Sequence, residues 1–281
     1  MNSNPITSAS SSNYVMGRTS EEYERLRRQS EAMEPITRSV LARVGLSAGM
    51  SCLDLGCGPG EVMRLMADQV GQIGRVVGID VDARLGAEML SILKSKGYQQ
   101  CSFVEGNVES LEQIASDAFD LVFARFLLMH LDDPVMALRK MYSRVRPGGR
   151  IVVQDYYFPT MDGYPDFEAG AEFKQVFFGV YEKEGKETRM GLKLPALFID
   201  AGIGHPDGTD VAGFLHSAAV GAKMIAAVYR SVLPLALKHG ITTEERSAWF
   251  FEEMRKLEEG NCYLLSPSLV SAWKQKAAEG L

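Results

Sequence analysis

Apolar residues recur along this chain in two periods, and the two periods alternate over the first 155 residues. Short apolar runs predict β-strands at 51–55, 75–79, 100–105, 119–123 and 150–154. Apolar residues three and four positions apart predict helices at 36–44, 61–70, 83–96 and 134–145. Strands that alternate with helices are typical of a doubly wound, mostly parallel α/β sheet, in which ligands bind beyond the carboxyl ends of the strands.

After residue 155 the pattern becomes less regular. Residues 156–191 are rich in aromatic side chains, and we expect those at 156–158 and 177–181 to lie mainly in the core. A helix at 192–201, a strand at 209–215, helices at about 218–239 and 243–259, and a last strand at 262–265 follow. The capping box Thr242-x-x-Glu245 begins the later helix. We therefore predict a seven-stranded sheet with a helical insertion, at about 218–259, between its last two strands.

The beginning of the chain divides into two parts. Residues 1–13 are rich in Ser, Asn and Thr and contain little to bury, so we expect a disordered tail that carries no targeting signal. Residues 14–45 contain a capping box at Thr19-x-x-Glu22 and a second helix after Pro35, and we interpret them as helices that cover the main domain. That domain is expected to occupy residues 46–281.

Charge and composition narrow the functional classes. The net charge of −6 provides no basic surface for a nucleic-acid backbone, so a nucleic-acid partner is not expected. The apolar stretch at 217–237 is interrupted by Lys223, Arg230 and Pro234, which favours a buried helix over a membrane span. The four cysteines match no zinc spacing, so we expect no metal site and reduced cysteines in a cytoplasmic protein. We expect no membrane partner, and either a monomer or a homodimer.

The strongest chemical signal is the sequence LDLGCGPGE at the first strand-to-helix corner. Gly56, Gly58 and Gly60 allow a tight turn and the close approach of a ligand to a helix N-terminus. NAD-binding proteins place G-x-G-x-x-G at the same corner, but the spacing here is G-x-G-x-G. Asp54 stands two residues before the first glycine, where a carboxylate suits an ammonium group better than a pyrophosphate. A tight turn without a ligand is the alternative.

A second acidic residue follows the second strand. Asp80 lies twenty residues after Gly60, where a carboxylate can accept hydrogen bonds from both ribose hydroxyls. This feature supports a ribose without distinguishing NAD from S-adenosylmethionine. The alternative is that Asp80 caps the next helix, a role that suits Asp82 better.

Taken together, the motifs LDLGCGPGE, VVGIDVD, FVEGNVESL, FDLVFARFLLMHLDDP and RPGGRIVVQD resemble the class I S-adenosylmethionine-dependent methyltransferases. The resemblance covers about residues 36–155 and implies a Rossmann-like methyltransferase fold. It also implies a cofactor role for each matching residue. Gly56, Gly58, Gly60 and Asp54 would hold the methionine part, Asp80 the ribose, Val81, Asn107 and Val108 the adenine, and Ala124 and Arg125 the ammonium end. Asn107 departs from the Asp that is commoner in the family, and Arg125 could equally pair with a neighbouring acid.

The segment from Tyr14 to Arg18 resembles the lid of a subgroup of small-molecule methyltransferases, with Tyr14 placed over the sulfonium. A flexible arm is the alternative for this segment. The acceptor side is less defined. His130, Asp155 and Tyr156 are the candidate catalytic residues, and His130 is as consistent with a packed histidine as with a base.

These observations predict S-adenosylmethionine-dependent methyl transfer to a small molecule, such as a secondary metabolite or a related compound; the subgroup that the chain resembles includes enzymes of quinone biosynthesis and of secondary metabolism. They leave open whether oxygen, nitrogen, carbon or sulfur is methylated, since the resemblance does not fix the acceptor. Two other functions remain as alternatives: an NAD-dependent oxidoreductase, and a regulatory protein that binds the cofactor without catalysis.

Overall fold

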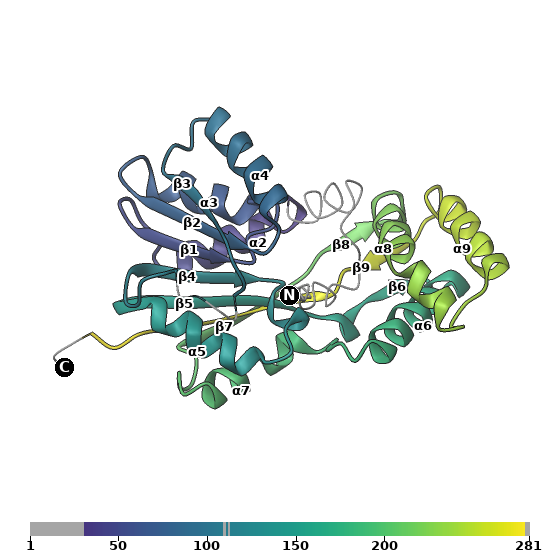
Figure 1. Ribbon diagram of the computed structural model, residues 1–281. Coiled ribbons are helices and arrows are strands. Elements are labelled where there is room, and N and C mark those ends of the chain that lie inside the picture. The colour runs from purple at the N-terminus through teal and green to yellow at the C-terminus, as the bar shows by residue number, and fades with distance from the viewer. Residues whose placement is uncertain (1–30, 109–110, 112, 279–281) are drawn as a thin grey trace, which may run out of the picture.

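The computed structural model describes residues 31–108, 111 and 113–278 of the 281-residue chain. The predictions for the tail at 1–13, for Tyr14 and for the capping box at Thr19 lie outside the described residues. Within them, the chain forms a seven-stranded sheet covered by helices on both faces, and a smaller lobe beside it (Figure 1).

The main sheet has the strand order β3-β2-β1-β4-β5-β10-β7. Its strands are β1 (Ser51–Leu55), β2 (Arg75–Asp80), β3 (Cys101–Glu105), β4 (Phe119–Arg125), β5 (Val145–Tyr157), β7 (Gly208–Ala212) and β10 (Ser268–Gln275). The first five strands pair in parallel, whereas β10 is antiparallel to both of its neighbours, β5 and β7. The order reverses beside β1, since β2 and β4 flank it, and ligands bind at such a switch point in doubly wound sheets. The predicted seven-stranded, mostly parallel sheet is confirmed.

The alternation of side chains along the strands creates two separate cores. Leu53 and Leu55 of β1 belong to the cluster that includes α5 and α7, whereas Cys52 belongs to the cluster that includes α2, α3 and α4. These helices span α2 (Glu34–Arg43), α3 (Glu61–Val70), α4 (Ala83–Ser95), α5 (Pro134–Arg144) and α7 (Met190–Asp200). Successive residues of a strand point to opposite faces, so Asp54 lies on the same face as Cys52.

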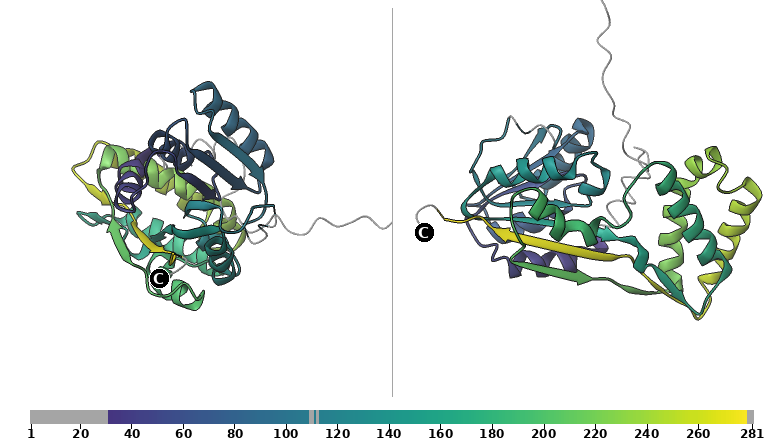
Figure 2. Two further views of the ribbon diagram at one scale, coloured as in Figure 1. Left: turned by 90° about the vertical axis from the view of Figure 1, so that its left-hand side faces the viewer. Right: turned by 90° about the horizontal axis from the view of Figure 1, so that it is seen from below.

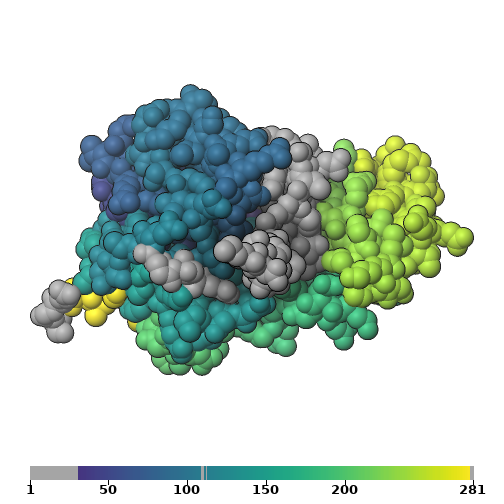
Figure 3. Space-filling model, viewed as in Figure 1, coloured from purple at the N-terminus to yellow at the C-terminus, as the bar shows by residue number. Residues whose placement is uncertain are grey.

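A smaller unit, here called the appended lobe, extends from the carboxyl ends of the strands. It consists of α6 (Glu168–Lys183), α8 (Ala218–Lys238), α9 (Glu244–Leu257) and a three-stranded sheet of β6 (Asp162–Tyr164), β9 (Tyr263–Leu265) and β8 (Leu215–Ser217). The strands β5, β7 and β10 lead from the main sheet toward this lobe (Figure 2). The lobe and the first three strands with their helices lie at opposite ends of the molecule (Figure 3).

Two predictions for this region are wrong, and one helix was missed. The expected last strand at 262–265 is β9 of the small sheet, and the last strand of the main sheet is β10. The expected strand at 209–215 is divided between two sheets, because the chain leaves β7 after Ala212 and enters β8 at Leu215. The helix α6 was not expected, although Phe173, Val176, Phe177 and Val180 follow a helical period.

The capping residues agree better with the sequence patterns. Asp82 and Asp133 accept hydrogen bonds from the amides of Leu85 and Met136 at the starts of α4 and α5. The N-cap of α9 is Thr243, not Thr242 as predicted. The hydroxyl of Thr242 is instead buried in the appended lobe, where it donates to Glu172 at 3.1 Å.

The apolar helix α8 has the length and composition of a membrane span. It packs against α6 and α9 in the appended lobe. Only 28% of its most apolar window is buried, so the prediction of a buried helix is only partly correct. Tyr229, Val232 and Ala236 form its buried side.

Candidate functional site

The glycine loop connects β1 to α3 at the switch point of the sheet. The amides of Gly56 and Cys57 donate to the carbonyl of Ile79 at 2.8 and 3.0 Å, so the loop is held against the end of β2. Gly58 and Gly60 have φ values of 47° and 79°, in the left-handed region that side chains with a Cβ avoid. A Cβ at Gly60 would also overlap the side chain of Met89. Both the turn and its packing on α4 therefore require glycine at position 60.

Asp80 fastens this loop to the next strand. Its Oδ2 accepts from the amide of Gly58 at 2.9 Å, and its Oδ1 accepts from the amide of Asp82 at 3.1 Å. The helix cap is Asp82, as the sequence favoured, so the capping alternative for Asp80 is wrong. A carboxylate has about four acceptor positions, and two amides leave room for the two hydroxyls of a ribose.

Asp54 is the most unusual charged group of the site. It is 2% exposed, and among the described residues no hydrogen-bond donor reaches its Oδ2 atom. Burial raises its pKa to about 7, against the opposing effect of the Arg125 guanidinium. A buried carboxylate oxygen without a donor is costly for the folded protein, which is typical of functional sites.

Arg125 approaches the same region from the end of β4. It is buried, and this burial lowers its pKa, while Asp54 provides the largest opposing contribution. Its Nη1 donates to the hydroxyl of Thr37 on α2 at 2.9 Å. That hydroxyl donates to Gln154 Oε1 at 2.9 Å, and Gln154 Nε2 donates to Ser271 Oγ at 2.9 Å. These links were not expected from the motifs, although a threonine on the apolar face of α2 (Thr37) and a glutamine in an apolar strand (Gln154) are visible signals; Ser271 carries no such signal.

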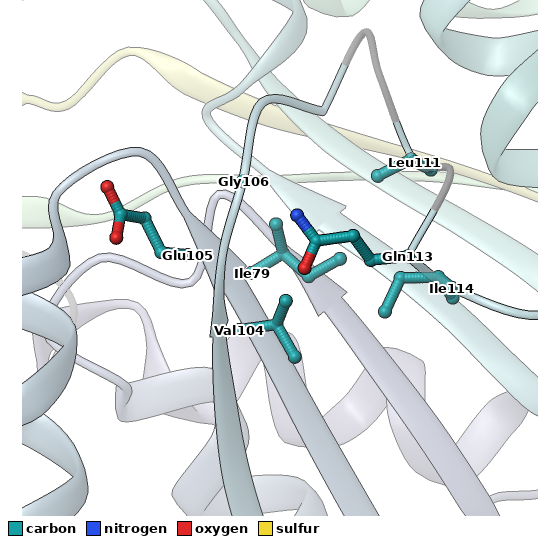
Figure 4. Close-up of a pocket in the computed structure, with 7 residues that line it drawn as sticks. All are labelled: Ile79, Val104, Glu105, Gly106, Leu111, Gln113 and Ile114. Carbon is teal, nitrogen blue, oxygen red and sulfur yellow. The ribbon is translucent and has the colours of Figure 1, made fainter.

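The expected adenine side lies at the carboxyl ends of β2 and β3. Val81 is 47% exposed after β2, whereas Val108 is buried in the same core cluster as Ile79. A small, open hollow lies beside these strand ends, and the stick view in Figure 4 shows the side chains around it. Its lining consists of Ile79, Val104, Glu105, Gly106, Leu111, Gln113 and Ile114. Asn107 directly follows Gly106, one of these lining residues, in the chain.

An aromatic pair occupies the ends of β4 and β5. Phe126 stacks on Tyr156 with ring centroids 4.2 Å apart and an interplanar angle of 17°. Phe126 has a φ of 57°, which is strained for a bulky residue, and its amide donates to the carbonyl of Gln154. Tyr156 in turn contacts Phe158, which packs on Phe177 and Tyr181 in the core, as the sequence predicted for these aromatics.

The remaining acceptor-side candidates have different environments. Asp155 is fully buried, and its carboxylate accepts from the backbone amides of Met129 and Tyr156 at 3.2 and 2.9 Å. Burial raises its pKa to about 7. Its oxygens thereby hold the 3-10 turn η1 (Leu128–His130) against the end of β5. His130 ends that turn and is half-buried.

Comparison with known proteins agrees with this geometry. The family described as "Methyltransferase domain" matches residues 46–190, about half of the chain. The chain belongs to this methyltransferase family. Its relatives include demethylmenaquinone methyltransferases of Oceanobacillus iheyensis and Bacillus licheniformis. The first is 34% identical over 45% of this chain and 53% of its own length, and the second is 31% identical over 55% and 71%.

The solved structures support the same fold. A candidate methyltransferase from Bacillus halodurans has a TM-score of 0.59 at 16% identity, over 86% of this chain and 99% of that one. The chain spans 53–64% of the length of the first three curated relatives. The class I methyltransferase resemblance and its fold are thus confirmed, and S-adenosylmethionine is the cofactor this membership implies.

The residues present fit that cofactor. Its amino acid part carries an ammonium group, and the Oδ2 of Asp54 is a buried acceptor that lacks a donor among the described residues. Asp80 has acceptor capacity for the ribose, and the exposed side chain of Val81 offers an apolar surface to a base. No cluster of His, Cys, Asp and Glu in the described part of the chain has the arrangement of a metal site.

Proposed function

We propose that this protein transfers the methyl group of S-adenosylmethionine to a small molecule in the cytoplasm. The observation that carries the proposal is the buried Oδ2 atom of Asp54, which no donor among the described residues reaches and which lies at the switch point beside the glycine loop. An ammonium group placed there would satisfy this oxygen. A pyrophosphate would be repelled by the ionised carboxylate, which disfavours the NAD-dependent alternative.

The other cofactor residues have matching tasks in this proposal. Asp80 accepts the ribose hydroxyls, and Val81, Asn107 and Val108 surround the adenine. The backbone at Ala124 and Arg125 borders the ammonium end. The bound cofactor supplies a methyl group that is already activated toward nucleophiles. The protein's contribution is then alignment of the acceptor with that methyl group and exclusion of water.

The acceptor is proposed to carry an aromatic or quinonoid ring. The half-buried ring of Phe126, stacked on the buried ring of Tyr156, offers a flat apolar surface at the ends of β4 and β5. The names of the relatives point to demethylmenaquinone, which contains such a ring. Stacked rings contribute about 0.5–1.5 kcal/mol beyond burial, so this surface favours a planar acceptor over an aliphatic one.

Binding of the cofactor is tested first, with S-adenosylhomocysteine in isothermal titration calorimetry and thermal unfolding. We expect binding and an increase of the melting temperature, since a ligand of the folded state stabilises it. Binding of NADH but not of S-adenosylhomocysteine would favour the oxidoreductase alternative.

Turnover is tested next with labelled S-adenosylmethionine, a demethylmenaquinone analogue and cell extract, followed by mass spectrometry of the product. Cofactor binding without turnover over this panel would favour the regulatory alternative. Tyr156→Phe keeps the ring and removes the hydroxyl. Loss of turnover with unchanged cofactor binding in this variant would assign the hydroxyl a catalytic role, whereas full turnover would assign the ring a role in positioning.

A further inference from the structure

One buried polar group near the site has no task in the proposed function. Thr37 lies on α2, outside the strand-end motifs, and its side chain is fully buried. We propose that Thr37 is a positioning residue, which fixes the Arg125 guanidinium and thereby the electrostatic environment of the cofactor's methionine end. This inference rests on the proposed cofactor site.

The hydrogen bonds give the Thr37 hydroxyl a defined direction. Ser271 accepts from the amide nitrogen of Gln154, so the amide oxygen of Gln154 is turned toward Thr37. Thr37 donates its single proton to that oxygen, and its own oxygen is left to accept from Arg125 Nη1. Each bond is 2.9 Å long, and Thr37, Gln154 and Ser271 are fully buried. The relay from Ser271 to Arg125 therefore has one orientation in which every bond is made.

This relay joins four separate elements at one point. Ser271 lies on β10, Gln154 on β5, Thr37 on α2 and Arg125 on β4. Of these four residues only Thr37 comes from outside the sheet, so it connects α2 directly to the strand ends. The helix α2 is also fastened to α3, the helix that begins at the glycine loop, by an ion pair between Glu34 and Arg64.

The relay bonds hold Arg125 to Thr37 and not to Asp54, so Arg125 acts on the Asp54 carboxylate through its charge. The strength of this interaction depends on where the guanidinium lies. The interaction between two charges falls with distance and is strong where water is excluded. A guanidinium that loses its acceptor on Thr37 can move toward the Asp54 carboxylate and compete with the ammonium group of a ligand. Thr37 thus keeps the cation beside the carboxylate but separate from it.

The test compares Thr37→Val, which removes the hydroxyl at nearly equal volume, with Thr37→Ser, which keeps it. The readout is the Kd of S-adenosylhomocysteine from calorimetry, together with the free energy of unfolding in urea. We expect an increase of Kd of about tenfold or more for Thr37→Val, in line with the loss of a hydrogen bond to a charged group. Thr37→Ser keeps the hydroxyl, so its Kd should lie within about twofold of the wild-type Kd.

Thr242→Val is the matched control. It removes a buried threonine hydroxyl that also bonds to a charged group, Glu172, but in the appended lobe. We expect this control to lower stability while leaving the Kd unchanged. Loss of stability in Thr37→Val with a wild-type Kd would overturn the inference, since Thr37 would then be structural only.

A second variant keeps the test decisive if Thr37→Val does not fold. Ser271→Ala removes the far end of the relay and leaves Thr37 and Arg125 in place. We expect a smaller increase of Kd, about threefold, because the amide of Gln154 loses its fixed orientation. An unchanged Kd would overturn the relay. If the wild-type protein does not bind S-adenosylhomocysteine, the proposed function fails. If the wild type and Thr37→Val bind it with the same Kd, the proposed function stands and only the positioning role of Thr37 is refuted.

Discussion

Replacing Asp54 with asparagine should stabilise the protein without ligand and weaken its binding of cofactor. In the folded protein, burial raises the pKa of Asp54 from its ordinary value of 3.8 to about 7. A difference of this size corresponds to about 4 kcal/mol that disfavours the ionised form in the fold. Asparagine is neutral at every pH and avoids this cost. At about pH 8 we therefore expect Asp54→Asn to raise the free energy of unfolding by up to about 4 kcal/mol.

The direction of the pH dependence follows from the two pKa values. Between about pH 4 and pH 7 the folded protein holds a proton on Asp54 that the unfolded chain has released. Asp54 therefore stabilises the fold fully below its unfolded pKa, and this contribution is lost as the pH rises through the folded pKa. The stability gain from Asp54→Asn should accordingly be near zero at about pH 4 and greatest at about pH 8.

Cofactor binding should respond in the opposite sense. The ionised carboxylate is the form that pairs with an ammonium group, so the affinity of the wild type should increase about tenfold from pH 6 to pH 7.5. Asp54→Asn should bind S-adenosylhomocysteine about 10- to 100-fold more weakly and lose this pH dependence, since a charged hydrogen bond is replaced by a neutral one.

Urea unfolding at several pH values and calorimetry at pH 6 and 7.5 measure both effects, with Asp68→Asn, a surface acid outside the site, as the control. Wild-type affinity in Asp54→Asn would refute the assignment of Asp54 to the ammonium group. A stability difference that does not grow with pH would refute the burial argument.

The remaining predictions concern residues around the site and in the appended lobe. Gly60→Ala should lose about 1–3 kcal/mol of stability in urea unfolding, since its left-handed φ and the Met89 side chain both disfavour a Cβ, and it should lose cofactor binding. Burial also raises the pKa of Asp155 to about 7, so the free energy of unfolding of the wild type should fall between about pH 4 and pH 8. Asp155→Asn should make this fall smaller in urea unfolding, and equal pH profiles of the two proteins would contradict the prediction. Glu172→Ala removes the partner of Arg246 and of two hydroxyls, and should cost about 2–4 kcal/mol with an unchanged Kd for S-adenosylhomocysteine.

The parallel part of the sheet was predictable because its signals are local. The first three strands are short apolar runs that end at a glycine or an acidic residue, and the helices after them carry a clear period. The predicted bounds of β1 and α3 agree with the structure to the residue. The glycine loop was equally visible, since left-handed φ values impose glycine at fixed spacing.

The appended lobe was harder to predict because its organisation depends on pairings far apart in the sequence. β9 is an ordinary short strand, and only its hydrogen bonds to β6 and β8 place it outside the main sheet. Thr242 and Thr243 are both acceptable caps, and the burial of Thr242 against Glu172 decides between them.

The fold class and the methyltransferase family were readable in the sequence, as were the expected cofactor positions, because glycines and strand-end carboxylates act through the local backbone. The solvation and pairing of those groups depended on the packing of the folded chain. This packing buried Asp54 with an oxygen that no described residue reaches, set the Asp155 carboxylate against the amides of Met129 and Tyr156, and brought Thr37 to Arg125 across 88 positions of the chain. Burial and pairing arise from packing between distant segments, and packing also sets the pKa of each carboxylate.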